Sequence, residues 1–457
     1  MDKKVRKLLK AIVGPENFSE GESARRCYSY DATRLESAPD VVVWPETAGQ
    51  VASILGLANE YRIPVFPRGA GSGFTGGSIP TTGGIALCLT KMNRILGIDA
   101  ANLVATVEPG VINADLRRAV EKKGLFYPPD PASLNFSTIG GNVAECAGGP
   151  TCVKYGVTRS YVLGLEVVLA TGETTRVGRP LVKNVAGYDL VRLFCGSEGT
   201  LGVITQINLR LIPLPEAKTT IMAVFPSVDA AAKTVACTVE SRILPCALEF
   251  MDGTCIHAVE KHTQMGLPSN AGAILIIEAD GPARVLAEQR QRIESICKEC
   301  GAVSVESADD EDAREELWKA RRALSPAVSS LAPRKINEDV GVPPSRIPEL
   351  LRRVDDVAGE MDLIIANFGH AGDGNIHVNI LYDPEVDGMQ ARAEKASVLV
   401  FETALELDGT ITGEHGIGIT KVGFLERQIG RTQLDLMRGV KRVFDPNNIL
   451  NPDKLFF

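Results

Sequence analysis

Apolar and polar positions follow two different periods along this chain, and together they predict short strands interleaved with helices. In the N-terminal half, Thr47 and Gln50 form a capping box ahead of apolar residues at helical spacing, which predicts that a helix begins there. Alternating or continuous apolar runs predict the strands. These runs lie at 63–66, 85–89, 103–107, 162–170 and 203–211, and Pro213 and Pro215 close the last of them.

The same two periods continue beyond Pro215 with longer helices. Strands are predicted at 219–225, 247–251, 273–278 and 303–306, and the main helices at 228–242 and 283–300. This alternation is typical of an α+β domain with helices over one face of a sheet, and the tail from Val386 is again helical. We therefore predict an N-terminal helical segment (1–34), a first domain (35–214), a second α+β domain (215–385) and a helical C-terminal segment (386–457).

Composition and charge exclude several function classes. A chain of 457 residues exceeds one ordinary core, so two or three domains are expected. The net charge of −8 argues against nucleic acid or an anionic membrane as a partner. No apolar run approaches the roughly 18 residues of a membrane span, and residues 1–13 have the spacing of an amphipathic helix rather than a signal peptide. We expect a cytoplasmic protein, associated with a membrane only through a partner.

The ten cysteines are scattered along the chain rather than arranged as a framework. Cys297 and Cys300 form the one close pair and lack the second pair that a zinc ribbon needs, so we interpret them as free thiols. Cys146 and Cys152 flank a Gly-rich loop, and their role stays open.

The segment 370–377 predicts a hairpin. Its glycines disfavour a helix, and the turn pair Asp373-Gly374 separates two apolar runs. Side chains alternate along a strand, so His377 and Asn379 are expected on one face of the outgoing strand.

Three of the five histidines of the chain fall in this hairpin and in the segment Gly-Glu-His-Gly at 413–416. His370, His377 and Glu414 would supply two imidazoles and a carboxylate, which is a donor set for a divalent cation. His415 would remain as a base. The alternative interpretation is that these histidines are hydrogen-bonded residues at strand ends.

Three Gly-rich segments interrupt the first domain, at 68–84, 137–149 and 196–202. Successive N–H groups in such a turn form a concave anion site, which at 68–77 suits a pyrophosphate. The spacing matches neither a Walker loop nor a complete dinucleotide fingerprint. Each segment alone can be a structural turn, but three in one domain favour a cofactor site.

Six motifs follow one another along the chain: Val43-Trp-Pro-Glu-Thr, Pro67-Arg-Gly-Ala-Gly-Ser-Gly-Phe-Thr-Gly-Gly77, Val107-Glu-Pro-Gly110, Ile139-Gly-Gly-Asn142, Lys183-Asn-Val-Ala-Gly-Tyr-Asp-Leu190 and Ser197-Glu-Gly-Thr-Leu-Gly202. In this order they resemble a known FAD-binding domain, that of the vanillyl-alcohol oxidase (PCMH) type. Within that superfamily the chain resembles the FAD-linked 2-hydroxyacid dehydrogenases, the family of D-lactate dehydrogenase and the glycolate oxidase catalytic subunit, over about residues 35–457.

The resemblance implies which residues line the FAD site. Some members of the superfamily attach the flavin to a histidine near the end of the first Gly-rich loop, and Ser72 stands at that place here, so FAD is expected to be noncovalent. The first loop would hold the pyrophosphate through Arg68, Gly69, Ala70, Gly71, Ser72, Gly73, Thr75, Gly76 and Gly77. The rest of the wall would come from Ser137, Thr138, Gly141, Asn142, Gly148, Gly156, Thr158, Glu198, Gly199 and Val203.

The resemblance also assigns the metal and the base. It implies that His370, His377 and Glu414 hold a divalent metal, with zinc the first choice and iron or manganese the alternatives, and that His415 is the general base. An α-hydroxycarboxylate could chelate the metal, which would lower the pKa of its hydroxyl group. The base would then take the hydroxyl proton as hydride leaves for flavin N5.

A clamp for the substrate carboxylate should be an arginine, because its guanidinium is a fixed bidentate donor. The resemblance places this residue after a tryptophan, and Arg321 is preferred over Arg322 by register, with Ser325 one helical turn on. A solvated arginine on a charged helix is the alternative. Asn379 is expected to contact substrate as well, and either Lys335 or Asn337 could add a contact.

The expected function is therefore FAD- and metal-dependent oxidation of a D-2-hydroxyacid of the D-lactate or glycolate class to the 2-oxoacid. The second domain would bind the substrate, and the C-terminal segment would complete the active site. Electrons would pass to a separate acceptor, an electron-transferring flavoprotein or iron–sulfur subunit, or to a cytochrome or quinone. The alternatives are a noncatalytic FAD-holding subunit of an oxidase complex and a metal-dependent hydrolase.

Overall fold

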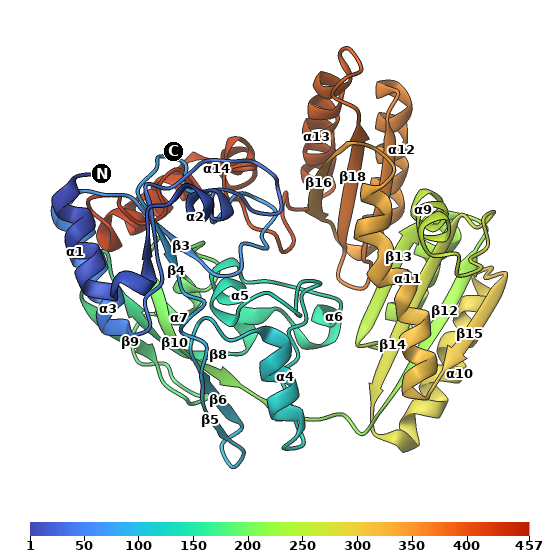
Figure 1. The fold of residues 1–457 in the computed structure, drawn as a ribbon. Coiled ribbons are helices and arrows are strands. Elements are labelled where there is room, and N and C mark those ends of the chain that lie inside the picture. Colours follow the sequence, from blue (N-terminus) through green and yellow to red (C-terminus); the bar gives the residue numbers. More distant parts are fainter. Residues whose placement is uncertain (457) are drawn as a thin grey trace. The chain divides into compact units, whose positions relative to one another are not determined.

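The computed structural model describes residues 1–456, which divide into two compact units (Figure 1). The first unit comprises residues 1–148, 157–214 and 414–457, and the second comprises 149–156 and 215–413. The expected break after residue 214 coincides with this border. The outer segments are distributed differently from the expectation, because 1–34 joins the first unit and 386–457 is shared between the two.

The first unit contains two main sheets. Four strands pair in the order β1-β2-β4-β3, and five pair in the order β5-β6-β10-β8-β9. The strands are β1 (Phe18–Ser19), β2 (Val41–Val43), β3 (Val65–Arg68), β4 (Ile85–Cys88), β5 (Ile95–Asp99), β6 (Val104–Val107), β8 (Val162–Val168), β9 (Thr174–Gly178) and β10 (Val203–Arg210), with β7 (Leu125–Phe126) and β11 (Ile212–Pro213) as a separate pair.

Helices of the first unit pack on these sheets. The helix α3 (Ala48–Tyr61) begins where the capping box predicts, since Thr47 Oγ1 accepts from the backbone N of Gln50 at 3.2 Å, but the Gln50 side chain accepts from Glu46 N. The others are α1 (Lys3–Val13), η1 (Pro15–Asn17), α2 (Glu22–Cys27), α4 (Asn113–Glu121), α5 (Ile139–Glu145), η2 (Thr158–Ser160), α7 (Leu190–Phe194) and α14 (Val422–Phe444), which is kinked at Gly430.

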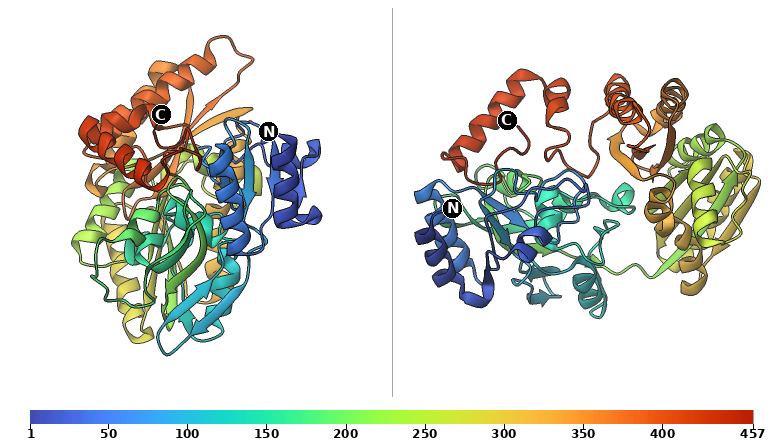
Figure 2. Two further views of the ribbon diagram at one scale, coloured as in Figure 1. Left: turned by 90° about the vertical axis from the view of Figure 1, so that its left-hand side faces the viewer. Right: turned by 45° about the horizontal axis from the view of Figure 1, so that its top comes forward.

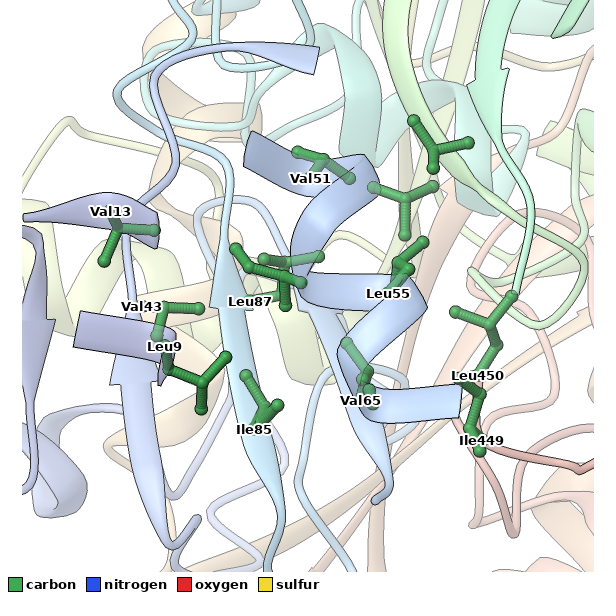
Figure 3. Close-up of a cluster of buried hydrophobic side chains, with 14 of the residues drawn as sticks. Leu9, Val13, Val43, Val51, Leu55, Val65, Ile85, Leu87, Ile449 and Leu450 are labelled. Carbon is green, nitrogen blue, oxygen red and sulfur yellow. The ribbon is translucent and has the colours of Figure 1, made fainter. Parts of the chain in front are cut away.

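One hydrophobic core joins both ends of the chain to the four-stranded sheet (Figure 3). The helix α1 lies against α3, as both views of Figure 2 show in blue, and contributes Leu9 and Val13. Ile449 and Leu450, near the C-terminus, enter the same cluster, and the backbone N of Val65 donates to Ile449 O at 2.7 Å. The ends of the chain therefore stabilise the sheet from which the first Gly-rich loop leaves.

The second unit is built on one seven-stranded sheet in the order β15-β12-β14-β13-β17-β18-β16. All its pairings are antiparallel. The strands are β12 (Ala217–Phe225), β13 (Ala247–Asp252), β14 (Ala273–Gly281), β15 (Ser304–Ala308), β16 (Arg334–Gly341), β17 (Ile364–His370) and β18 (Asn375–Tyr382). The last two form the predicted hairpin, in which His370 O accepts from the N–H groups of Asp373 and Gly374.

The helices α9 (Gly253–Thr263) and α11 (Glu311–Ser329) pack on one face of this sheet, against Met251, Ile274, Ile276 and Phe368. The register places the side chains of Glu249, His370 and His377 on this same face. The helices of the second unit are α6 (Cys152–Tyr155), α8 (Val228–Glu240), α9 (Gly253–Thr263), α10 (Ala283–Glu299), α11 (Glu311–Ser329), η3 (Pro344–Arg346), α12 (Ile347–Met361) and α13 (Met389–Glu406).

These elements confirm the predicted fold class of a mixed α and β chain whose C-terminal part is helical. Within residues 1–456, none of the helices combines the length and the apolar character that a membrane crossing requires.

Candidate active site

The first unit encloses a large cavity between its Gly-rich segments. The cavity contains about 1290 Å³ of space without protein atoms, part of it open to solvent. Its wall includes residues of all three Gly-rich segments, and Glu414 and His415 also line it. Backbone N–H groups of such segments suit the phosphates of a dinucleotide.

The first Gly-rich loop packs directly on the second. A Cβ on Gly69 would lie 2.3 Å from Thr138 Oγ1, so only glycine allows this approach. Arg68, at the end of β3, is buried, donates to Ser78 Oγ at 3.1 Å and lies over the ring of Tyr28. The loop therefore places a fixed cation in the cavity wall, where a pyrophosphate could be held.

The second Gly-rich segment contributes polar atoms that lack partners. Thr138 caps α5 by accepting from Gly141 N at 3.2 Å. The buried Ser137 Oγ and Asn142 Nδ2 form no hydrogen bond in the described protein, although both residues line the cavity. Buried polar atoms are nearly always paired, so these two atoms fit a polar ligand such as FAD.

The segment that follows Gly413 is tied to the first loop. Thr75 Oγ1 donates to His415 O at 3.2 Å, and the ring of His415 stacks on that of Phe74 with centroids 5.0 Å apart. A Cβ on Gly76 would lie 2.5 Å from Ile419 Cγ1. Thr75 and Gly76 thus hold His415 at the cavity and are themselves absent from its lining.

Most residues expected to bind FAD lie together in the lining of this cavity. They are Arg68, Gly69, Ala70, Gly71, Ser72, Gly73, Gly77, Ser137, Thr138, Gly141, Asn142, Gly148, Glu198, Gly199 and Val203. Thr158 is buried, and its hydroxyl donates to Ala147 O at 2.7 Å, while Gly156 ends α6 in the second unit. Residues that the sequence did not single out include Phe74, Glu145 and Ser133.

Cys146 and Cys152 do not line this cavity, although they flank a Gly-rich loop. Cys146 ends α5 and its sulfur lies 3.2 Å from Arg159 Nε, whereas Cys152 begins α6 in the second unit. Like the other eight cysteines, both are free thiols.

Two carboxyl groups meet in the cavity wall. Burial raises the pKa of Glu145 well above 4.5, and the neighbouring charges of Glu198 and Asp31 raise it further. Burial also raises the pKa of Glu198, but that carboxylate accepts from Ile417 N at 2.8 Å and from Gly418 N at 2.7 Å. We therefore assign the negative charge to Glu198 and the proton to Glu145, whose Oε2 has no partner in the described chain.

The substitution Glu145→Gln is expected to stabilise the protein increasingly as the pH rises. Above about pH 4.5 the carboxyl ionises in the unfolded chain but stays protonated in the folded one, so its cost to the stability of the fold grows with pH and reaches its full value once it ionises there too. The difference in melting temperature between the variant and the wild type, at matched flavin content, should therefore grow as the pH rises above about 4.5. A constant difference would contradict this assignment, and Glu173→Gln, at an exposed position, serves as the control.

In the second unit, the hairpin brings His370 and His377 together. Both are buried, their rings meet edge to face at 5.3 Å between centroids, and their ligand nitrogens lie within 4.8 Å of one another. Two imidazoles are donors for zinc, iron or manganese, so this pair fits the expected metal. Gly374 turns the chain with a φ of +85°, and a Cβ there would lie 1.8 Å from Val342 O.

A buried carboxylate connects the histidine pair to the predicted arginine. Glu249 of β13 has Oε1 2.7 Å from His370 Nδ1 and Oε2 2.5 Å from Arg321 Nε. Burial alone would raise the pKa of Glu249, but the charges and hydrogen bonds of His370 and Arg321 outweigh burial and lower this pKa. Arg322 instead is half exposed and pairs with Glu315.

The other expected substrate residues lie on or near the same sheet face. Asn379 Nδ2 donates to Ala366 O at 3.1 Å, and the buried Oδ1 of Asn379 has no partner in the described chain. Asn337 is the cross-strand neighbour of Asn379, and its buried Oδ1 also has no hydrogen-bond partner in the described chain. Lys335 lies two residues earlier on the same face of β16, across from Leu381. Ser325 is exposed on α11. Two adjacent unpaired amide oxygens favour a polar ligand at this face.

Asp339 fixes the chain just before Glu414. Asp339 is a buried residue of β16, and its register partner in β18 is His377. The Asp339 carboxylate accepts from Gly413 N at 3.0 Å and from Thr412 Oγ1 at 3.1 Å. Gly413 is the last residue of the second unit, and Glu414 follows it directly.

Comparisons with known proteins agree with this geometry. The family model "FAD binding domain" matches residues 39–178, and "FAD linked oxidases, C-terminal domain" matches 214–455. The chain is 47% identical to the glycolate oxidase subunit GlcD of Bacillus subtilis, over 99% of this chain and 97% of that protein. It is 36% identical to the D-lactate dehydrogenase of Anaerostipes hadrus, over 97% and 96% respectively.

A solved structure of p-cresol methylhydroxylase shares the fold. Its TM-score is 0.81 at 19% sequence identity, and the match covers 99% of this chain and 96% of that one. This likeness confirms the expected PCMH type of FAD-binding fold. Together with the two family models and the relatives, it shows that the chain belongs to the FAD-linked oxidases, in the group of the glycolate oxidase GlcD subunits and the D-lactate dehydrogenases, and is an FAD-linked oxidoreductase.

Proposed function

We propose that this protein oxidises a D-2-hydroxyacid of the D-lactate or glycolate class to the 2-oxoacid, with noncovalent FAD and a divalent metal. The observation that carries the proposal is the grouping of His370, His377 and Arg321 around one sheet face of the second unit. Metal-binding imidazoles next to a guanidinium suit a small molecule that has both a hydroxyl and a carboxylate.

The proposed metal ligands are His370, His377 and Glu414. Asp339 supports this set, because it holds Gly413 and thereby fixes the residue to which Glu414 is attached. Two neutral imidazoles and one carboxylate leave a divalent ion with a net positive charge and with open positions for substrate. Zinc is the first choice for such ligands, and iron or manganese are the alternatives.

Each remaining polar residue has a proposed task. Arg321 binds the substrate carboxylate, Asn379 contacts the substrate, and His415 takes the hydroxyl proton. His415 is held for this task by Phe74 and Thr75 at the wall of the FAD cavity. When bound, the metal would acidify the hydroxyl and FAD would accept the hydride.

We further infer that electrons leave the protein through a separate acceptor. A relative that matches almost the whole chain is named as a subunit of glycolate oxidase, which favours a partner protein, and an electron-transferring flavoprotein or iron–sulfur subunit is our first expectation. A cytoplasmic location, with membrane association only through such a partner, stays a prediction.

Anaerobic reduction of the bound flavin by a panel of acids tests the proposed reaction. Glycolate and the D and L enantiomers of lactate and of larger 2-hydroxyacids are mixed with the protein, and the visible flavin absorbance is followed. We expect at least one glycolate or D-acid to bleach the flavin, and a D-acid to react about 100-fold faster than its L enantiomer, because with hydroxyl and carboxylate both held only one enantiomer would point its Cα hydrogen at the flavin. Equal rates for both enantiomers, or no bleaching by any acid, would contradict the proposal.

A further inference from the structure

We propose that Glu249 is a positioning residue that holds the metal ligand His370 and the substrate arginine Arg321 through its two carboxylate oxygens. This inference rests on the proposed function, since it concerns how the ligands of that site are oriented. The sequence comparison and the motifs give no role to Glu249. Its burial, its position in the sheet and its two contacts carry the proposal.

The position of Glu249 follows from the sheet register. Glu249 lies directly across from His370 in the β13–β17 pairing, so the two side chains project from the same face. Its side chain is completely buried, and its neighbours along β13 are apolar. A carboxylate at such a place is costly unless it is paired. Both of its oxygens are paired here, one with an imidazole and one with a guanidinium.

The contact with His370 defines which nitrogen of that ring would bind a metal. A carboxylate accepts a hydrogen bond, so the Nδ1 that lies 2.7 Å from Glu249 must carry the proton. The lone pair of the neutral ring then lies on Nε2, which becomes the ligand atom. A carboxylate behind a ligating histidine orients the ring and increases its basicity.

The contact with Arg321 uses only one edge of the guanidinium. Glu249 Oε2 accepts from Nε at 2.5 Å, and the guanidinium carbon lies 5.0 Å from the centroid of Phe368. These contacts fix the plane of the guanidinium and leave its two terminal nitrogens for a substrate carboxylate. Glu249 therefore fixes the position of the metal ligand His370 relative to the substrate clamp Arg321.

The variant Glu249→Gln tests the two contacts in a protein that should still fold. Glutamine is nearly isosteric and its oxygen can still accept one hydrogen bond, but its amide nitrogen cannot accept the second. We expect a 10- to 100-fold weaker affinity for Zn²⁺, measured by competition with a chelator, and a KM for the hydroxyacid raised by about 10-fold or more. Glu278→Gln is the matched control, since Glu278 is a buried glutamate on the neighbouring strand that bonds Thr220 and Trp318.

Two further variants distinguish the contact of Glu249 with Arg321 from its contact with His370. Arg321→Met should raise KM strongly and leave the Zn²⁺ affinity within about 3-fold of wild type, because the His370 contact persists. Arg322→Met, the exposed neighbour, should change neither quantity. If Glu249→Gln does not fold, Glu249→Asp replaces it, because a side chain shorter by one methylene should not reach both partners.

The outcomes separate this proposal from the proposed function. A folded Glu249→Gln or Glu249→Asp protein with wild-type Zn²⁺ affinity and wild-type KM would overturn the positioning role while the proposed reaction stands. A wild-type protein that binds no divalent metal, or whose flavin no hydroxyacid reduces, would instead refute the proposed function. The proposal would also be overturned if Glu278→Gln weakened the Zn²⁺ affinity as much as Glu249→Gln does. The loss of affinity would then not depend on the His370 contact.

Discussion

His415→Ala is expected to lower the rate of flavin reduction by substrate by about 10²- to 10⁴-fold while FAD stays bound. The side chain of His415 lies at the wall of the FAD cavity and stacks on Phe74, and its backbone carbonyl is held by Thr75. Alanine removes the proposed base and keeps the backbone contact. The measurement is anaerobic stopped-flow reduction, with flavin content determined from the absorbance of the same sample.

Flavin content and melting temperature serve as controls for His415→Ala. If the variant lost FAD, the effect would be structural, since the cavity wall itself would then have failed. If the variant kept FAD and reduced it at the wild-type rate, the assignment of His415 as base would be wrong.

His370→Ala and His377→Ala are each expected to lose the bound metal and to slow flavin reduction by at least about 100-fold. Polarisation of the substrate oxygen by a metal contributes several kcal/mol to such reactions, and each 1.36 kcal/mol corresponds to a factor of ten in rate. The two rings lie edge to face on the hairpin, so removal of either one leaves an incomplete donor set. Metal content by elemental analysis and the reduction rate are measured on the same preparation.

His257→Ala provides the matched control for these two variants. His257 lies exposed on α9 of the same unit, away from the hairpin strands in sequence. It should keep both metal and rate. Normal metal content in His370→Ala with full turnover would show that this histidine is not a ligand.

The sequence predicted those parts of the fold that depend on local rules. The capping box at Thr47 marks the start of α3, and the turn pair Asp373-Gly374 marks the hairpin, because both signals act over a few residues. Side chains alternate along a strand, so the placement of His377 and His370 on one face was accessible from the sequence. The preference for Arg321 over Arg322 rested instead on the register of the family resemblance, which places an arginine after a tryptophan.

Other features depend on contacts across long stretches of sequence and could not be predicted. Glu249 meets His370 only because β13 and β17 are neighbours in the sheet, although a glutamate within an apolar strand was a usable signal. The FAD contact of Thr75 stays a prediction, and the hydrogen bond from its hydroxyl to His415, which lies 340 residues further along the chain, had no sequence signal. Glu145 gave no local signal at all, since its burial results from Glu198 and the segment 416–418 packing around it.

Local sequence patterns also do not determine which of the two units a segment joins. The helix α1 was assigned to a segment of its own, but Leu9 and Val13 pack in the core of the first unit together with Ile449 and Leu450 (Figure 3). Hydrophobic periodicity identifies the buried face of a helix and does not identify the partner that covers it.

Metal removal and restoration test the central claim most directly. The protein is treated with a strong chelator, freed of chelator and then reloaded with Zn²⁺, Mn²⁺ or Fe²⁺, and anaerobic flavin reduction by its preferred hydroxyacid is followed at each stage at constant FAD content. We predict that reduction falls by at least about 100-fold on metal removal and returns with one of these ions. Unchanged reduction in protein shown to be free of metal would contradict a metal-dependent oxidation.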